Sequence, residues 1–186
     1  MRAKQFALLF FVLCCGCTEY YPKPKALLRV DAAERYQVAD SLSFARFQTL
    51  SGARILPEKE SGQEVWINIL YPFYNAEFYG TYRRFSAPKE LTELCDDFYK
   101  LLDRNVRDEE VYYAHFEDAA RATYGYLYWS DAPIPSPVQF FVTDSARHFF
   151  RGAVYFSDSL SYEMRVPYAR AFSDEMMRLI ESFNWK

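Results

Sequence analysis

Residues 138–157 read VQFFVTDSARHFFRGAVYFS, and this stretch decides the class of fold. The runs 138–143 and 148–157 are rich in Phe, Val and Tyr, which favour strands. The four residues between them include Asp and Ser, which favour turns. The pattern therefore predicts two strands joined by a tight turn at 144–147. Strands connected in this way pair antiparallel, so we expect an antiparallel sheet.

A second pair of strands is predicted upstream of this stretch. Residues 65–71 (VWINILY) alternate, which places Ile67 and Ile69 on one face and Asn68 on the other. Residues 76–84 (AEFYGTYRR) follow closely, so the two runs are expected to form a hairpin. Aromatic residues fall on both faces of this hairpin. Some of them must therefore meet a helix on the far face or form an exposed patch.

The region between the two pairs carries weaker signals. Residues 88–104 have apolar side chains at positions 91, 94, 95, 98, 101 and 102, which is the spacing of one helix face. Residues 111–116 and 124–129 indicate two further strands. Residues 131–137 (DAPIPSP) contain three prolines, which cannot occupy a ladder, and are predicted to be a loop.

The C-terminal segment is predicted to be a helix. Pro167 is expected in its first turn. Its apolar stripe consists of Ala169, Phe172, Met176, Leu179, Ile180 and Phe183. Tight meanders combined with amphipathic helices predict an α+β fold, in which an antiparallel β-sheet is flanked by amphipathic helices.

The N-terminus, MRAKQFALLFFVLCCGC, has the build of a bacterial lipoprotein signal peptide. Arg2 and Lys4 precede an apolar run that is too short to span a bilayer. Gly16 and Cys17 end it in the manner of a lipobox, so lipidation is predicted on Cys17. Cys15 is the competing acceptor, and a plain secretory signal or a buried N-terminal helix is the alternative.

Three segments are therefore expected: a lipoprotein signal peptide at 1–16, a lipidated N-terminus and Pro-containing tether at 17–26, and one globular domain at 27–186. Thr18, not Asp, follows Cys17. By the usual sorting rule for lipoproteins, this favours the outer membrane, facing the periplasm, over the inner membrane.

Several classes of chemistry lack support. The net charge is −3 without a long basic run, which argues against nucleic acid as a partner. No glycine-rich phosphate-binding motif occurs. His115 with Glu117 and Asp118 is interpreted as a polar edge and not as a metal site, because no ligand spacing typical of metals accompanies it. No cofactor, metal or small-molecule substrate is expected.

Ser145 and His148 with Asp144 suggest a hydrolase, but their spacing fits a turn between strands better. Three arginines are more informative. Arg83, Arg84 and Arg151 lie among aromatic residues, a composition that is common at protein interfaces. The competing interpretation is that their stems pack along the sheet while the charges stay in water.

The chain resembles a known family, the gliding motility lipoproteins called GldD. The resemblance runs through nearly all of the chain after Cys17. Its blocks are YPKPK (21–25), LRVD (28–31), WINI (66–69), YNA (74–76), YGYLY (124–128), SPVQFFVTDS (136–145), HFFRGAVYF (148–156) and LIESFNWK (179–186).

The resemblance implies a non-enzymatic lipoprotein of the cell envelope that is needed for gliding motility and works beside the type IX secretion machinery. Its expected partners are the membrane, through the lipid anchor, and other envelope proteins of gliding or secretion. The family has no known catalytic residues to carry over. The order of the last strands and helix also resembles the PsbP-like α/β/α sandwich, which bears on the fold alone.

Two other functions remain open from the sequence. One is a lipoprotein that binds a lipid or a peptidoglycan fragment in an aromatic pocket between the sheet and the final helix. The other is a hydrolase of envelope polymers, for which Ser145 and His148 are the candidate residues.

Overall fold

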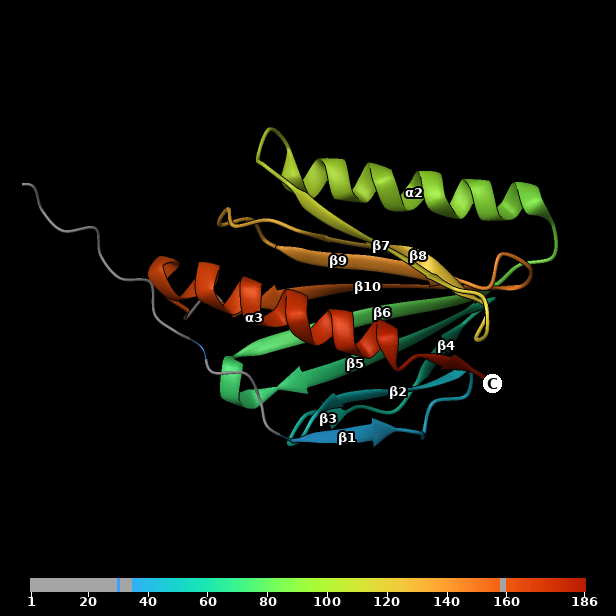
Figure 1. Ribbon diagram of the computed structural model, residues 1–186, viewed down its shortest axis with the longest axis horizontal. Helices are drawn as coiled ribbons and strands as arrows, with labels where there is room; N and C mark the ends of the chain where they lie inside the picture. Colours follow the sequence, from blue (N-terminus) through green and yellow to red (C-terminus); the bar gives the residue numbers. More distant parts are fainter. Residues whose placement is uncertain (1–29, 31–34, 158–159) are drawn as a thin grey trace, which may run out of the picture.

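The computed structural model describes Val30, residues 35–157 and residues 160–186 (Figure 1). The predicted signal peptide, Cys17 and the tether at 17–26 lie outside the described residues. The described chain forms two antiparallel sheets and two long helices, which confirms the predicted α+β class. The likeness to PsbP-like sandwiches remains a prediction.

The larger sheet has the strand order β3-β5-β6-β10-β9-β8-β7, with β4 paired to β5. Its elements are β3 (Arg54–Ile55), β4 (Lys59–Ser61), β5 (Glu64–Tyr71), β6 (Ala76–Arg84), β7 (Tyr112–Asp118), β8 (Thr123–Trp129), β9 (Val138–Thr143) and β10 (His148–Phe156), with the 3-10 turn η1 (Pro72–Tyr74) between β5 and β6. All the strands predicted from the sequence are present. The predicted β5–β6 hairpin and the predicted β9–β10 pair are both confirmed.

The β6–β10 pair at the centre of this sheet depends on two facing glycines. Gly152 lies opposite Gly80 in the register. A Cβ atom on Gly152 would lie 2.2 Å from the ring of Phe78, and one on Gly80 would lie 2.7 Å from Ile67 and from the ring of Phe150. Because neither glycine carries a side chain, the neighbouring rings can pack directly over the backbone.

The smaller sheet was not predicted. It has the order β1-β2-β11 and consists of β1 (Tyr36–Ala39), β2 (Ala45–Leu50) and β11 (Asn184–Trp185). The last residues of the chain thus pair with a strand near the start of the domain, with Trp185 opposite Ala45. A strand of two residues is too short for alternation to be visible in the sequence.

The helices α2 (Pro88–Val106) and α3 (Tyr162–Glu181) lie on opposite faces of the larger sheet (Figure 1). The prediction that Pro167 occupies the first turn of the last helix is wrong, since α3 begins at Tyr162 and Pro167 lies inside it. Proline removes only one backbone N–H donor, and α3 accommodates this loss because its buried stripe holds it on the sheet.

The core lies mainly between the larger sheet and α3. Its largest fully buried side chains include Phe47, Phe78, Phe140, Phe150, Phe172 and Phe183. The rings of Phe150 and Phe183 lie 5.8 Å apart, so the sheet and the residues after α3 share one aromatic cluster. A second, smaller cluster, centred on Phe98, Phe141 and Phe149, holds α2 on the other face.

Candidate functional site

The three arginines identified from the sequence lie on both faces of the sheet. Arg83 lies opposite Phe149, and Arg151 lies opposite Thr81, on the face that α2 covers. Arg84 follows Arg83 directly, so strand alternation places it on the α3 face. The structure therefore brings Arg83 and Arg151 to one face and Arg84 to the other.

The segment around Asp144 is a tight turn, as predicted. Asp144 Oδ1 accepts hydrogen bonds from the backbone N–H groups of Ala146, Arg147 and His148, at 2.9, 2.8 and 2.8 Å. Burial opposes ionisation of Asp144, yet these donors hold the pKa of its carboxyl below its ordinary value. Ser145 takes a positive φ of 62° at the tip. Asp144 thus stabilises the turn through Oδ1, while its Oδ2 lies 4.0 Å from Nε2 of His148.

His148 contacts both sheets. Its Nδ1 atom lies 2.8 Å from the hydroxyl of Tyr82, and its ring stacks on Trp185 with centroids 5.2 Å apart. Burial lowers the pKa of His148, which favours the neutral imidazole. These contacts fit a residue that packs between the two sheets.

The contacts of His115 and its acidic neighbours also fit a structural role. The ring of His115 lies 4.8 Å from that of Tyr126, and Asp118 forms an ion pair with Arg121. Within residues 35–157 and 160–186, no group of three or more His, Cys, Asp or Glu side chains comes close enough to hold a metal ion.

A groove of about 790 Å³ lies between the C-terminal half of α2 and the face of β6 and β10 below it. We call it the arginine groove, because Arg104, Arg107 and Arg151 line it. Its other lining residues include Tyr79, Tyr155, Leu101, Ile134, Asp108 and Glu109. Leu101 was predicted on the buried face of the helix but is 40% exposed, since it lies at the edge of this groove.

The arginines of the groove come from the end of α2 and from β10, and they are unpaired. Arg104 lies in the last turn of α2, Arg107 ends that helix with a φ of 57°, and Arg151 lies within β10. In the described part of the chain, none of the three forms an ion pair or a side-chain hydrogen bond. Nearby on the same face, Arg83 Nε is buried without an acceptor. The groove therefore offers several free guanidinium donors.

Exposed aromatic side chains adjoin these donors. Tyr79 and Tyr155 are 43% and 41% exposed and stack edge to face at 5.5 Å, and Trp66 on neighbouring β5 is 43% exposed. Tyr, Trp and Arg are the residues that contribute most at protein interfaces. Sequence reasoning found Arg151 but missed Arg104 and Arg107, because only the folded chain brings the end of α2 over β10.

Between the central strands and α3, the described residues leave no aromatic pocket, so the pocket proposed there is not present. A hollow of about 330 Å³ lies beside α3 instead, with Tyr36, Tyr74 and Phe172 among its lining residues. Phe172, Met176 and Leu179 of α3 are at most 1% exposed and fill the space against Phe150 and Ile69 of the sheet. The larger concave aromatic surface lies on the opposite face, beside α2.

One acidic group is buried under α3. Glu175 Oε1 accepts hydrogen bonds from the backbone N–H of Leu50 at 2.9 Å and from the Thr49 hydroxyl at 3.2 Å. Its Oε2 atom is buried and has no partner among the described residues. Burial raises the pKa of Glu175 to about 7, despite the two donors. This carboxyl joins α3 to β2 and is remote from the arginine groove.

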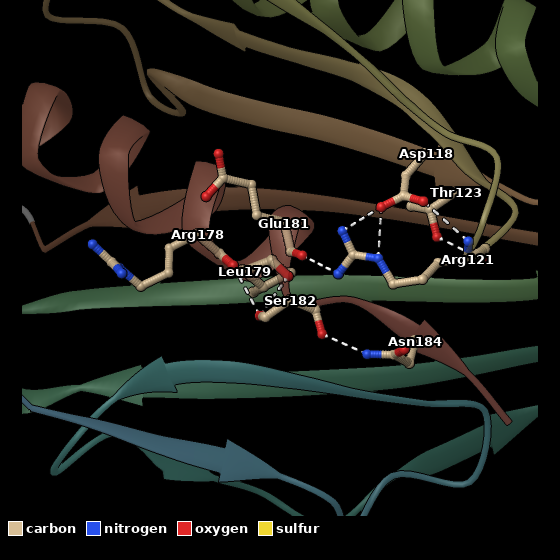
Figure 2. Close-up of polar contacts among 8 residues, drawn as sticks. All are labelled: Asp118, Arg121, Thr123, Arg178, Leu179, Glu181, Ser182 and Asn184. Atoms are coloured by element: carbon tan, nitrogen blue, oxygen red, sulfur yellow. Dashed lines mark hydrogen bonds and ion pairs between the residues drawn. The ribbon is translucent and has the colours of Figure 1, made fainter.

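A polar network holds the end of α3 against the β7–β8 turn (Figure 2). Arg121 bonds Asp118 within the turn and also donates to the carbonyl of Glu181. Ser182 Oγ bonds the carbonyls of Arg178 and Leu179 and accepts the backbone N–H of Gln48 at 2.8 Å. This network fixes the C-terminal segment and contributes no free group to the groove.

None of the helices in the described residues is both long and apolar enough to cross a membrane. A search of curated proteins found no match. A family model described as "Gliding motility lipoprotein GldD" matches residues 17–185, a range that begins at Cys17.

Proposed function

Since this chain belongs to the gliding motility lipoprotein GldD family, we propose that it is anchored in the cell envelope through lipid on Cys17 and acts as a non-enzymatic accessory component of the gliding and type IX secretion machinery. The outer membrane, facing the periplasm, is the proposed location. In this role the domain binds other envelope proteins.

The arginine groove is the observation that carries the binding role. Free guanidinium groups beside exposed aromatic rings are suited to contact the carboxylates and apolar groups of a partner protein. Arg151 lies at the centre of this surface, with Arg83 on the same face. The turn geometry of Asp144 and the Tyr82 contact of His148 support a role without catalysis.

The experiment is to complement a deletion strain with wild type, Arg151→Glu or Arg84→Glu, and to measure surface spreading, secretion of a type IX cargo and co-purifying envelope proteins. Arg151→Glu is expected to lose both the partner and spreading. Arg84→Glu, on the α3 face, is the matched control and is expected to retain them. Equal behaviour of the two variants would remove the arginine groove from the proposal.

Cys17→Ala, in the same assay, separates anchoring from binding. If secretion fails in the deletion strain and Cys17→Ala does not restore it, the anchored protein belongs to the export pathway. Loss of spreading with intact secretion would place it in the motility apparatus downstream. Full rescue by Cys17→Ala would contradict the anchored role.

A second function is favoured by the size of the arginine groove. Its volume of about 790 Å³ is in the range of small-ligand sites. We therefore retain binding of a lipid or peptidoglycan fragment as the alternative. Native mass spectrometry of protein extracted from its own membranes tests it. An added mass that Arg151→Glu loses would favour the small ligand over the protein partner.

A further inference from the structure

The turns that connect the strands of the larger sheet lie at its two ends. The registers show which turns share an end. At one end lie η1, the last residues of β5, β8 and β10 and the first residues of β6, β7 and β9. The register pairs that establish this are Tyr71 with Ala76, Ala76 with Phe156, Val138 with Val154 and with Trp129, and Tyr112 with Trp129. Figure 1 shows that α2 ends and α3 begins at this end as well.

This end carries the two most exposed aromatic side chains of the described residues, and we call it the aromatic end. Its exposed aromatic side chains outside the arginine groove are Phe73 (84%), Tyr113 (66%) and Tyr112 (39%). A single exposed aromatic residue is ordinary, but two that are more than 60% exposed at the same end of a sheet are candidates for a contact surface.

The opposite end, which we call the polar end, is different. Its turns are 62–63, 85–87, 119–122 and 144–147, and their sequences are GQ, FSA, AARA and DSAR. Within these described turns, no large apolar side chain is exposed, because Phe85 is buried, and in the strands near this end the exposed aromatic side chain is Trp66, at 43%. Exposed aromatic side chains are therefore not a general feature of the loops in this domain.

Phe73, the most exposed of these side chains, is held by a rigid support. Its ring packs edge to face on Tyr74 at 5.0 Å, and Tyr74 packs in the same way on Phe172 of α3 at 5.3 Å. Asn75, with a φ of 48°, closes the turn behind it by donating its N–H to the carbonyl of Pro72. The ring is thus presented outward without further ordering of the chain.

The predicted lipid attachment site is tied to the same end. Val30, the first described residue, lines a hollow together with Tyr74, the neighbour of Phe73. Residues 18–29 separate Val30 from Cys17, and a chain of that length spans at most about 45 Å even when fully extended. Lipid on Cys17 therefore keeps Val30, beside Tyr74, within about 45 Å of a bilayer surface.

We infer that the aromatic end rests on the surface of the lipid bilayer that holds the anchor. This inference rests on the proposed lipidation of Cys17. Tyr and Phe side chains favour the boundary between headgroups and acyl chains, where a ring is partly buried and a hydroxyl stays wet. Because the tether makes the contact intramolecular, weak insertion of a few rings is sufficient to hold it.

Charges do not explain the contact. Arg107, Asp108 and Glu109 lie together near this end, so both signs are present. Docking is therefore expected to persist at high salt, in contrast to attraction by a basic patch. Docking of the aromatic end points the strands away from the membrane. The polar end is then farthest from the lipid, and the arginine groove, which Tyr79 and Tyr155 line, lies beside it.

The test uses full-length lipidated protein in vesicles of phosphatidylethanolamine and phosphatidylglycerol. A Cys95→Ser background removes the free thiol of the described domain. Phe73→Cys or Ala146→Cys then carries an environment-sensitive fluorophore, with Ala146 as the matched exposed position at the polar end. Flotation of the vesicles and quenching by brominated lipids are both measured.

We expect the protein to float with the vesicles and brominated lipids to quench most of the emission at position 73 and none at position 146. Flotation with position 73 unquenched would overturn docking and leave anchoring intact. Failure to float would overturn the anchoring proposal and docking together. Loss of quenching in high salt would contradict an aromatic contact.

Discussion

The two faces of the larger sheet differ in how completely they are covered. The α3 face is closed by α3 together with β1, β2 and β11, and its central rings are fully buried. The α2 face is covered by a single helix, which leaves Trp66, Tyr79 and Tyr155 more than 40% exposed. The closed face accounts for most of the stability of the domain, whereas the open face is available for binding.

The largest expected effect comes from truncating the closed face. Phe150 is fully buried and lies within 6.5 Å of the rings of Phe44, Phe47, Phe78, Phe140 and Phe183. Phe150→Ala should lower the free energy of unfolding by about 3–5 kcal/mol. Urea unfolding followed by far-UV circular dichroism measures it. A loss below 1 kcal/mol would show that this face is less important than its burial indicates.

A second test of the closed face is how the stability of the protein depends on pH. Burial raises the pKa of Glu175 to about 7, above its ordinary value of about 4.3. Between these values the folded protein keeps a proton that the unfolded chain has lost. The contribution of Glu175 to the free energy of unfolding is therefore fully present below pH 4. It falls by on the order of 3 kcal/mol as the pH rises towards 7.

Glu175→Gln removes that titration, so the difference in stability between wild type and variant should change between pH 5 and pH 8. Comparing the two proteins is necessary, since the lowered pKa of His148 acts in the opposite sense, with stability lost as the pH falls below its ordinary value. Parallel stability curves for the two proteins would refute the buried, protonated Glu175.

A smaller effect is expected where α3 joins β2. Ser182→Ala removes the acceptor for the backbone N–H of Gln48 and the two bonds to α3 carbonyls. A loss of about 1–2 kcal/mol is expected. Chemical denaturation of this variant beside Ser86→Ala, an exposed serine outside the network, provides the comparison.

The smallest effect on stability is expected on the open face. Tyr155→Ser should lower the free energy of unfolding by no more than about 1 kcal/mol, because the ring is 41% exposed and its main ring contact is with the similarly exposed Tyr79. The same variant should weaken partner capture in pull-down assays. A large loss of stability would mean that the open face is structural, and the contrast between the faces would disappear.

Most of the larger sheet was predictable because its strands are long, rich in aromatic and β-branched residues and separated by turn residues. The Phe- and Val-rich run at 138–143 and the Asp144 turn are examples. The short strands β1 and β11 were not predictable, since their pairing depends on contacts between distant parts of the chain. Pro167 was misplaced because helix-start preferences were given more weight than the continuing apolar stripe.

The arginine groove was predictable only in part. Arg151 was identified from its aromatic neighbours, but its unpaired state depends on the residues that lie around it in three dimensions. Arg104 and Arg107 belong to a helix surface that looks ordinary in the sequence. The location of the open concave face was mispredicted, because hydrophobic periodicity shows which side of a helix is buried but not how much of the sheet the helix covers.

The pairing of β11 with β2 has a consequence for folding kinetics. Lys186 donates its N–H to the carbonyl of Phe44 at 2.9 Å, and its ammonium group bonds the carbonyls of Asp40 and Leu42. The bond to Asp40 joins residues 146 positions apart, so the smaller sheet forms only after a very long loop has closed. Contacts of such high sequence separation slow folding, and we expect the smaller sheet to form after the hairpins of the larger one.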